Sequence, residues 1–291
     1  MLKEDGAEPR LIPMLGYKPL IGVVHLPPLT TERRRGDDID HLIEYAISEA
    51  VKLEESGFDA IIVENFGDGP YHMDPGDDKL LIATMAVIVR EITRRVKLPV
   101  GVNVLRNAAT SSLAVAYSSG AHFIRVNSYC ETRLTPEGLM EPAGAAVEDM
   151  RSRLPRYVAV FADVDVKHSW GLAPVEESVR ECVVRGSMDA LIVSGSRTGA
   201  APQPGYVASI RALAGNKPII IGSGVSYENI INYWTVADGF IVGTSIKLWG
   251  TRSPISVEKA AKLAQKVKEL RSGRDIPLGG RFLLEHWDRK T

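Results

Sequence analysis

The sequence lacks several features that mark particular classes of protein. Its formal net charge is −1 over 291 residues, with neither a basic surplus for nucleic acid nor an acidic tail. The dense basic run Arg33-Arg34-Arg35 is typical of a solvated loop. The apolar runs are only as long as a strand, so no transmembrane helix is predicted. Because residues 1–10 are polar and acidic, they do not resemble a signal peptide, and we predict a cytoplasmic protein that binds no nucleic acid.

Cysteine and glutamine are scarce as well. The two cysteines, Cys130 and Cys182, lie far apart in the sequence and do not have the spacing of a metal site. We therefore expect two ordinary thiols in a reducing cytosol. The two glutamines stand beside many arginines, lysines and glutamates, a composition that is typical of a heat-stable source.

Eight short apolar runs alternate with helical patterns along the chain. The predicted strands cover residues 20–25, 60–64, 100–104, 123–127, 158–166, 190–194, 218–222 and 240–243. The predicted helices cover residues 39–56, 78–95, 108–119, 143–153, 175–185, 205–214, 227–235 and 257–271. This alternation predicts parallel strands that close into a (β/α)8 barrel, or TIM barrel, of the phosphate-binding type. A doubly wound sheet is the alternative, but no Gly-x-Gly-x-x-Gly follows the first predicted strand.

We place the barrel at residues 18–272, between an N-terminal extension at 1–17 and a C-terminal tail at 273–291. The tail contains Phe282, Leu283, Leu284 and Trp287. Such a tail more often docks on its own barrel or on a neighbouring subunit than on a membrane. We therefore expect a homo-oligomer, with peripheral membrane contact as the alternative.

Two apolar runs near the C-terminus end in glycines and hydroxyl residues. Residues 219–224 read Ile-Ile-Ile-Gly-Ser-Gly, and residues 239–245 read Gly-Phe-Ile-Val-Gly-Thr-Ser. In a TIM barrel, the turns after the seventh and eighth strands present backbone N–H groups to a phosphate. We therefore predict a phosphorylated small-molecule ligand, bound at Gly222, Ser223, Gly224, Gly243, Thr244 and Ser245.

The remaining strand ends carry polar residues that would meet at the end of the barrel where TIM-barrel active sites lie. The predicted substrate-binding residues are Asn65, Asn103, Arg125, Asn127, Ser194 and Arg197. The predicted catalytic residues are His25, Glu64, Asp163, Asp165, Lys167 and His168. Buried polar groups cost stability unless they find partners, and so many at one end exceed what closing a barrel needs.

Charged and apolar residues alternate along the fifth predicted strand. Period-two alternation would send Asp163, Asp165 and Lys167 to one face, at the barrel mouth. Two acids and a lysine so close together would shift one another's proton affinities. We interpret them as general acid/base groups or a divalent-metal anchor, and a structural cluster of ion pairs is the alternative.

Three further residues have more than one interpretation. Glu64 is a second candidate acid or base, or else a carboxylate paired with an arginine such as Arg125. His25 is either hydrogen-bonded scaffolding or functional, and His168 is a candidate proton shuttle. His25, Glu64, Asp163 and His168 could together ligate one divalent metal, although no spacing rule supports such a site.

Lys167 raises the alternative of a Schiff base, as in barrel aldolases. Such lysines lie deep in an apolar pocket, whereas Lys167 lies at the far end of its strand. Two acids beside it are expected to keep its amine protonated. We therefore favour acid/base chemistry over a Schiff base.

Residues 194–199, Ser-Gly-Ser-Arg-Thr-Gly, form a hydroxyl-rich loop after the sixth predicted strand. Its composition favours a lid over a phosphorylated ligand, with Arg197 reaching an anion. An ordinary connection is the alternative. The loop at residues 67–73 is also glycine-rich and could cover the mouth.

The sequence resembles the BtpA/SgcQ family from about residue 18 to residue 271. The segments that carry the resemblance are 21–29 (IGVVHLPPL), 62–68 (IVENFGD), 101–107 (GVNVLRN), 123–127 (FIRVN), 162–168 (ADVDVKH) and 192–199 (IVSGSRTG). The resemblance implies a (β/α)8 barrel. It also implies one of two functions, since BtpA-type members are linked to photosystem I biogenesis and SgcQ-type members are described as nucleosidases.

Two functional hypotheses follow. The first is an enzyme that cleaves or isomerises a phosphorylated sugar or nucleoside by acid/base chemistry, as a hydrolase or nucleosidase, a lyase or an isomerase. The second is a non-enzymatic assembly or stabilising factor that reuses the barrel. The ring of ionisable residues at one end favours the enzyme.

Overall fold

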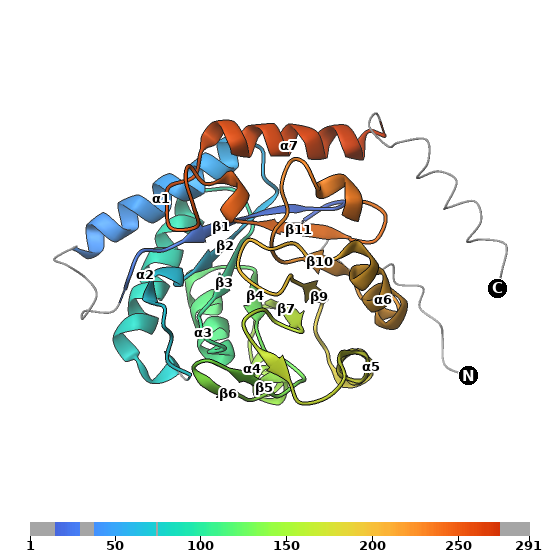
Figure 1. Ribbon diagram of the computed structural model, residues 1–291. Helices are drawn as coiled ribbons and strands as arrows, with labels where there is room; N and C mark the ends of the chain where they lie inside the picture. Colours follow the sequence, from blue (N-terminus) through green and yellow to red (C-terminus); the bar gives the residue numbers. More distant parts are fainter. Residues whose placement is uncertain (1–14, 30–37, 74, 274–291) are drawn as a thin grey trace.

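The computed structural model describes residues 15–29, 38–73 and 75–273, and within them eight parallel strands close into a barrel (Figure 1). In barrel order these are β1 (Leu20–His25), β2 (Ala60–Glu64), β3 (Val100–Asn103), β4 (Phe123–Val126), β7 (Ala159–Val164), β9 (Ala190–Val193), β10 (Ile219–Ile221) and β11 (Gly239–Val242). Strand β11 pairs in parallel with β1 and completes the ring. The fold is therefore a TIM barrel, as the sequence predicts.

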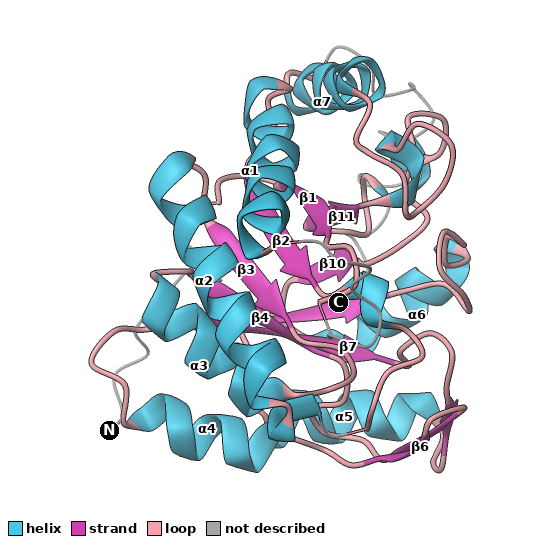
Figure 2. Cartoon of the chain, turned by 90° about the vertical axis from the view of Figure 1, so that its left-hand side faces the viewer, coloured by secondary structure: helices cyan, strands magenta, loops and turns pink. Residues whose placement is uncertain are grey.

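Helices lie outside the strands (Figure 2). They are α1 (Ile39–Glu55), α2 (Lys79–Arg95), α3 (Ala109–Ser119), α4 (Gly144–Ser152), α5 (Val175–Arg185), α6 (Pro204–Ala214) and α7 (Val257–Arg271). Side chains cap several of their first turns: Asp78 accepts from the Leu81 amide at 2.9 Å, and Ser256 accepts from the Lys259 amide at 3.3 Å. None of the described helices is long and apolar enough to cross a membrane.

The helix expected over residues 227–235 is wrong. The structure has only the 3-10 helix η3 (Ile230–Tyr233) in this stretch. The side chain of Asn229 accepts from the Ser226 amide at 2.8 Å and donates to the Gly224 carbonyl at 2.8 Å. These local bonds satisfy the backbone in a turn and so compete with an α-helix.

Strand β7 also ends earlier than expected, at Val164 rather than at residue 166. The next residue, Asp165, has a φ of 51°, which turns the chain away from the barrel. The segments after β4 and β7 then form a small antiparallel sheet that was not predicted. Its strands are β5 (Arg133–Thr135), β6 (Gly138–Met140) and β8 (Trp170–Gly171), with β5 in the middle.

The expectation of two free thiols is wrong as well. Cys130, after β4, and Cys182, in α5, form a disulfide with a Cα–Cα distance of 5.3 Å. The two cysteines are 52 residues apart in the sequence, and they come together only because the barrel places the end of β4 close to α5. The spacing alone therefore did not reveal the pair. The bond closes a long loop and so restricts the unfolded chain.

Large apolar side chains fill the barrel interior. Phe123 and Phe161 stack with ring centroids 4.8 Å apart, among Ile62, Ile192 and other buried aliphatic residues. Gly101 makes room for this stack, since a Cβ at that position would lie 2.1 Å from the Phe123 ring. The interior is therefore a packed core, and polar groups have space only above it.

At the opposite, N-terminal end of the strands, one hydrogen-bonding device recurs four times. The residue that precedes β2, β4, β9 or β11 accepts, through its side chain, a backbone N–H of the strand before it in the barrel, which is β1, β3, β7 or β10, respectively. The pairs are Asp59 with Leu20 (2.7 Å), His122 with Val100 (3.1 Å), Asp189 with Val160 (2.8 Å) and Asp238 with Ile219 (2.8 Å). In every pair the backbone N–H of the accepting residue donates in return to the carbonyl of the same partner.

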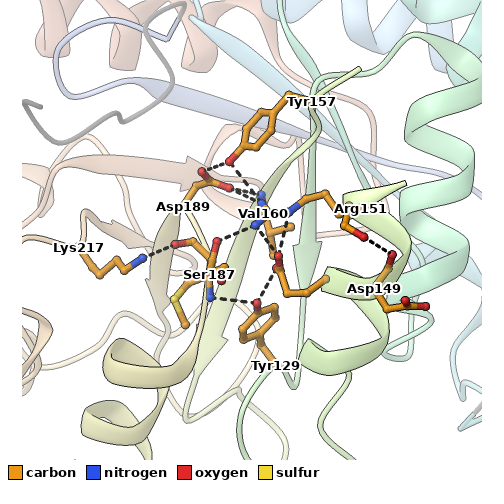
Figure 3. A network of polar contacts seen from close by, with 11 residues as sticks. Tyr129, Asp149, Arg151, Tyr157, Val160, Ser187, Asp189 and Lys217 are labelled. Carbon is orange, nitrogen blue, oxygen red and sulfur yellow. Dashed lines mark hydrogen bonds and ion pairs between the residues drawn. The ribbon is translucent and has the colours of Figure 1, made fainter. Parts of the chain in front are cut away.

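Three of the four accepting residues are aspartates, and arginines from the outer helices pair with all three. Arg271 pairs with Asp59, Arg151 with Asp189, and Arg211 with Asp238. Figure 3 shows the Asp189 clamp, where Tyr157 also donates to the carboxylate. Arg151 also donates to the Ser187 carbonyl at 2.8 Å. The clamps tie the helical layer to the strand ends, so this face serves stability.

We expect Asp189→Ala to lower the free energy of unfolding by about 2 kcal/mol, because the Val160 N–H and Arg151 lose a charged acceptor. Asp189→Asn is the matched variant, which keeps an acceptor for the amide but loses the ion pair. Its free energy of unfolding should lie between those of the wild type and Asp189→Ala. Urea denaturation followed by circular dichroism measures the difference. An Asp189→Ala protein as stable as the wild type would contradict the role of the clamp.

Candidate functional site

The C-terminal end of the barrel is organised around one buried arginine. Arg125, on β4, points its guanidinium to Asp163 on β7, with Nε to Oδ2 at 2.8 Å and Nη2 to Oδ1 at 2.9 Å. Its Nη1 donates to Glu64 Oε1, at the end of β2, at 3.2 Å. All three side chains are almost fully buried. Because the two carboxylates surround Arg125, its pKa is raised despite burial, and the group stays charged.

Amide side chains donate further hydrogen bonds to carboxylate oxygens that Arg125 already holds. Asn103, at the end of β3, donates to Glu64 Oε1 at 3.0 Å, and Asn127 donates to Asp163 Oδ2 at 2.8 Å. Burial favours the neutral form of Glu64, but Arg125 and the Asn103 hydrogen bond outweigh it, and the pKa of Glu64 is lowered. Glu64 is therefore an ionised carboxylate suited to act as a base.

His25, at the end of β1, completes this ring. Its Nε2 lies 3.9 Å from Glu64 Oε2, and its ring contacts Phe66 at a centroid distance of 4.6 Å. Burial lowers the pKa of His25 to about 3, against an ordinary value of 6.5. The imidazole is thus neutral at physiological pH.

A cavity of about 250 Å³ lies directly above this network. Its walls include Glu64, Asn103, Arg125, Asn127 and Lys167. Two buried polar atoms at this end of the barrel, Asn127 Oδ1 and Ser194 Oγ, have no hydrogen-bond partner in the described part of the chain. Unpartnered buried polar atoms are rare, and together with a cavity they indicate a ligand site.

Lys167 lies between this cavity and a larger groove. The groove has a volume of about 850 Å³ and shares Pro136, Val166, Lys167 and His168 with the cavity. Burial first, and then the positive charge of Arg125, lower the pKa of Lys167 to about 8. At neutral pH this amine is still mostly protonated; of the two acids expected beside it, Arg125 binds Asp163, and Asp165 lies elsewhere.

Asp165 is the acid that lies elsewhere. It pairs with Arg133 on β5 at 2.6 Å and accepts from the Tyr206 hydroxyl at 3.0 Å. The turn at Asp165 breaks the period-two alternation, so Asp163 and Asp165 do not share a face. Asp165 borders the groove, whereas Asp163 lies below the cavity.

His168 fastens two loops together at the mouth. Its Nε2 accepts from the Thr198 amide at 3.1 Å and lies 3.0 Å from the Thr198 hydroxyl. Partial burial and the neighbouring Lys167 lower the pKa of His168. The neutral ring therefore holds the loop after β9 against the loop after β7.

The predicted phosphate turns lie under the loop after β9. The Ser223 hydroxyl accepts from the Gly195 amide at 3.2 Å and donates to the Ala200 carbonyl at 3.0 Å. A Cβ at Gly224 would lie 2.1 Å from the Ala201 nitrogen, so only glycine fits beneath this loop. The loop is thus folded over the turns, and Arg197 is exposed along the groove; that the loop acts as a lid stays a prediction.

The second turn contains the 3-10 helix η4 (Thr244–Ile246), which follows β11. Thr244 Oγ1 lies 3.0 Å from Thr251 Oγ1, and Ser245 donates to the Val225 carbonyl at 2.6 Å. The backbone amides of Gly224, Thr244 and Ser245 donate no hydrogen bond to any residue that the structure describes. These N–H groups remain as donors for an anion.

Two of the predicted site residues contact other parts of the protein and do not line the cavity. Asn65 binds the loop after β3, accepting from the Leu105 amide at 2.7 Å and donating to Asp68 at 3.1 Å. Gly243 lies against His25, where a Cβ would come within 2.8 Å of the ring. Among the described residues no group of three or more His, Cys, Asp or Glu is arranged to hold a metal ion.

The cavity also has walls that the sequence analysis did not select. Arg106 is buried, donates to the Lys167 carbonyl at 2.9 Å, and lies 3.9 Å from Glu137. Tyr71 lies on the loop after β2 and donates to the Phe66 carbonyl at 3.0 Å. Glu137 comes from the turn between β5 and β6, which no sequence signal placed at the mouth. Arg106 was recognisable, since it follows the end of β3 by three residues.

Fold and site define a TIM barrel with a charged C-terminal mouth, and sequence comparison supplies the family. The chain belongs to the BtpA family, whose sequence model matches residues 16–269. An uncharacterized protein of Pyrococcus horikoshii is 42% identical over 257 residues, covering 88% of this chain and 98% of the relative. The photosystem I biogenesis protein BtpA of Synechocystis is 39% identical over 239 residues, covering 80% and 82%.

Solved structures with the same fold are much more distant in sequence. Phosphoribosyl anthranilate isomerase from Thermus thermophilus superposes with a TM-score of 0.56 at 14% identity, covering 87% of this chain and all of that one. A tryptophan synthase α-subunit from Pyrococcus furiosus superposes with a TM-score of 0.54 at 15% identity, covering 88% and 100%. At such identities the likeness shows the barrel fold alone.

We expect the protein to lose stability as the pH falls from about 6.5 towards 3, in part through His25. In that range the unfolded chain binds a proton at this residue and the folded chain does not, so stability rises with pH. Urea unfolding at about pH 7 and about pH 5 measures the loss. It should be smaller in His25→Gln, whereas His72→Gln, at an exposed position, should lose as much as the wild type. An equal loss in all three proteins would contradict the assignment.

Proposed function

We propose that this protein is an enzyme that acts on a phosphorylated sugar or nucleoside by acid/base chemistry at the barrel mouth. The observation that carries the proposal is the charged network of Glu64, Arg125 and Asp163 beneath a cavity of about 250 Å³. Converging ionisable groups with shifted pKa values are typical of active sites.

The residues around the cavity suggest a division of roles. Glu64 is ionised and has one oxygen, Oε2, turned away from Arg125, so it is the candidate base. Asn103, Arg125 and Asn127 would orient hydroxyl groups or stabilise developing negative charge. Arg125 and Asn127 already hold both oxygens of Asp163, which makes it a positioning group more than a proton donor. The reaction class is hydrolysis of a nucleosidic bond, elimination or isomerisation.

The turns after β10 and β11 would receive the phosphate. Their amides at Gly224, Thr244 and Ser245 are uncommitted among the described residues, and the loop after β9 lies over them. The named phosphoribosyl substrate of the isomerase with the same fold agrees with this choice but does not transfer to this chain by itself. A cytoplasmic location, a homo-oligomer and a heat-stable source stay predictions.

We expect inorganic phosphate and sugar phosphates to raise the melting temperature. At a hundredfold excess over the dissociation constant, binding stabilises by about 2.7 kcal/mol. Thr244→Asp places a carboxylate beside the uncommitted amides and should abolish the shift, whereas the nearly isosteric Thr244→Val keeps the amides and should retain it. A thermal-shift panel on the three proteins is the measurement. If the folded wild type shows no shift in melting temperature with any phosphate, the proposed phosphate site is wrong.

A second candidate function is a non-enzymatic assembly or stabilising factor for a membrane complex. The Synechocystis relative is a photosystem I biogenesis protein, which motivates this candidate, and an exposed apolar patch on the small sheet favours it. Leu134 on β5 lies between Leu139 on β6 and Trp170 on β8 in register, and the three side chains are 48%, 52% and 63% exposed. Exposed apolar patches mark interaction surfaces.

For this candidate we expect the protein to co-sediment with phosphatidylglycerol vesicles, and Leu139→Ser to weaken that binding. Val184→Ser is the matched control, because Val184 is an exposed aliphatic residue on α5, outside the patch. The control should bind like the wild type. Absence of co-sedimentation, or equal loss in both variants, would count against membrane contact through this patch.

A further inference from the structure

Lys167 is a half-buried residue for whose amine the described structure provides no partner. Its Nζ makes neither a hydrogen bond nor an ion pair with any described residue. Other buried or half-buried lysines are satisfied: Lys247 pairs with Glu49 at 3.3 Å, and Lys217 donates to the Met188 carbonyl at 2.8 Å. An ammonium that is partly withdrawn from water and has no partner is costly, so its presence at the wall of the cavity and of the groove indicates a functional role.

The backbone around Lys167 is held firmly while its amine is left uncommitted. Arg106 donates to the Lys167 carbonyl at 2.9 Å, and the next residue, His168, is clasped to Thr198. Strand β7 ends three residues earlier, below the same mouth. The side chain therefore has a fixed base from which to reach both the cavity and the groove.

The acids near Lys167 are committed to Arg125. Asp163 gives both oxygens to the guanidinium, and Glu64 gives Oε1 to the same group. Burial and the charge of Arg125 lower the pKa of Lys167 to about 8, so roughly a tenth of the amine is neutral at pH 7. Desolvation beside another cation is how enzymes prepare a lysine for attack on a carbonyl group.

Resting on the function proposed above, we propose that Lys167 is a nucleophile that forms a Schiff base with the carbonyl carbon of its substrate. The substrate class is then a phosphorylated aldehyde or ketone, such as the open-chain form of a sugar phosphate. This assignment reverses the preference drawn from the sequence, where the strand-end position argued against a Schiff base.

The covalent step balances with groups that the site holds. The lone pair of the neutral Nζ attacks the carbonyl carbon, and the carbonyl oxygen takes up the proton that the nitrogen loses, which gives a carbinolamine. Nitrogen then expels this hydroxyl, with a second proton, as water, and a protonated C=N bond remains. The net change consumes the carbonyl compound, the amine and one proton, and it releases one water. The iminium withdraws electrons, so Glu64 could accept a proton from the adjacent carbon or hydroxyl.

Borohydride trapping tests the proposal. The full chain is incubated with dihydroxyacetone phosphate, glyceraldehyde 3-phosphate or unphosphorylated glyceraldehyde, reduced with sodium borohydride, and analysed by intact and peptide mass spectrometry. We expect one adduct per chain, located at Lys167. At pH 7 its amine is neutral on the order of a hundred times more often than an ordinary surface lysine, so its labelling should exceed theirs by a similar factor.

The pH dependence of labelling provides a readout that needs no variant. Adduct formation at Lys167 should rise to half its maximum near pH 8, well below the range of surface lysines. Lys167→Met, shown to be folded by circular dichroism, should lose the adduct. The matched control, Lys79→Met at an exposed position on α2, should keep it.

The outcomes separate this inference from the proposed function. Trapping of phosphorylated and unphosphorylated carbonyl compounds alike would support Lys167 and remove the phosphate requirement. Thermal stabilisation by sugar phosphates without any adduct at Lys167 would overturn the Schiff base and leave the phosphate site standing. Labelling spread evenly over surface lysines would also overturn it.

Discussion

A guanidinium enclosed in the barrel determines how the C-terminal mouth is built. Arg125 can lie among buried groups only because Asp163 binds it through two hydrogen bonds and Glu64 through a third. Those acids come from different strands, so a single cation fixes β2, β4 and β7 relative to one another. Asn103 and Asn127 then donate second hydrogen bonds to oxygens that Arg125 already holds, Glu64 Oε1 and Asp163 Oδ2. The geometry of the cavity floor follows from satisfying this one charge.

The two ends of the barrel differ in how their polar groups are paired. At the N-terminal end, four clamps pair side chains with strand amides, and Arg151, Arg211 and Arg271 neutralise the acids. At the C-terminal end, Asn127 Oδ1, Ser194 Oγ and the amine of Lys167 remain without partners among the described residues. Within the same described part of the chain, Arg271 Nε at the N-terminal end also lacks a partner, but the unpartnered groups at the C-terminal end line the cavity and the groove, which distinguishes a stabilising face from a face open to a ligand.

The sequence predicted the barrel well because eight alternating runs leave few topologies, and all seven described α-helices lie within one residue of the expected bounds at both ends. The prediction failed where local side-chain hydrogen bonds or contacts between distant residues determine the structure. Asn229 stabilises a turn in place of a helix, and Cys182 meets Cys130 only after the barrel closes. The strand-end rule gathered Glu64, Arg125 and Asp163 correctly. It could not foresee the positive φ at Asp165, which removes that acid from the network.

Charge balance at the mouth explains why this lost acid matters for chemistry. Arg125 with Glu64 and Asp163 is one cation against two carboxylates, which leaves one negative charge to be matched nearby. Lys167 matches it when protonated, yet burial and Arg125 oppose that proton. Had Asp165 faced inward, a third acid would have secured the ammonium. With Asp165 held by Arg133 instead, the amine can give up its proton and attack, and the iminium that forms restores a positive charge where the network needs one. The turn that defeats the simple alternation of β7 is therefore the feature that makes a reactive lysine possible.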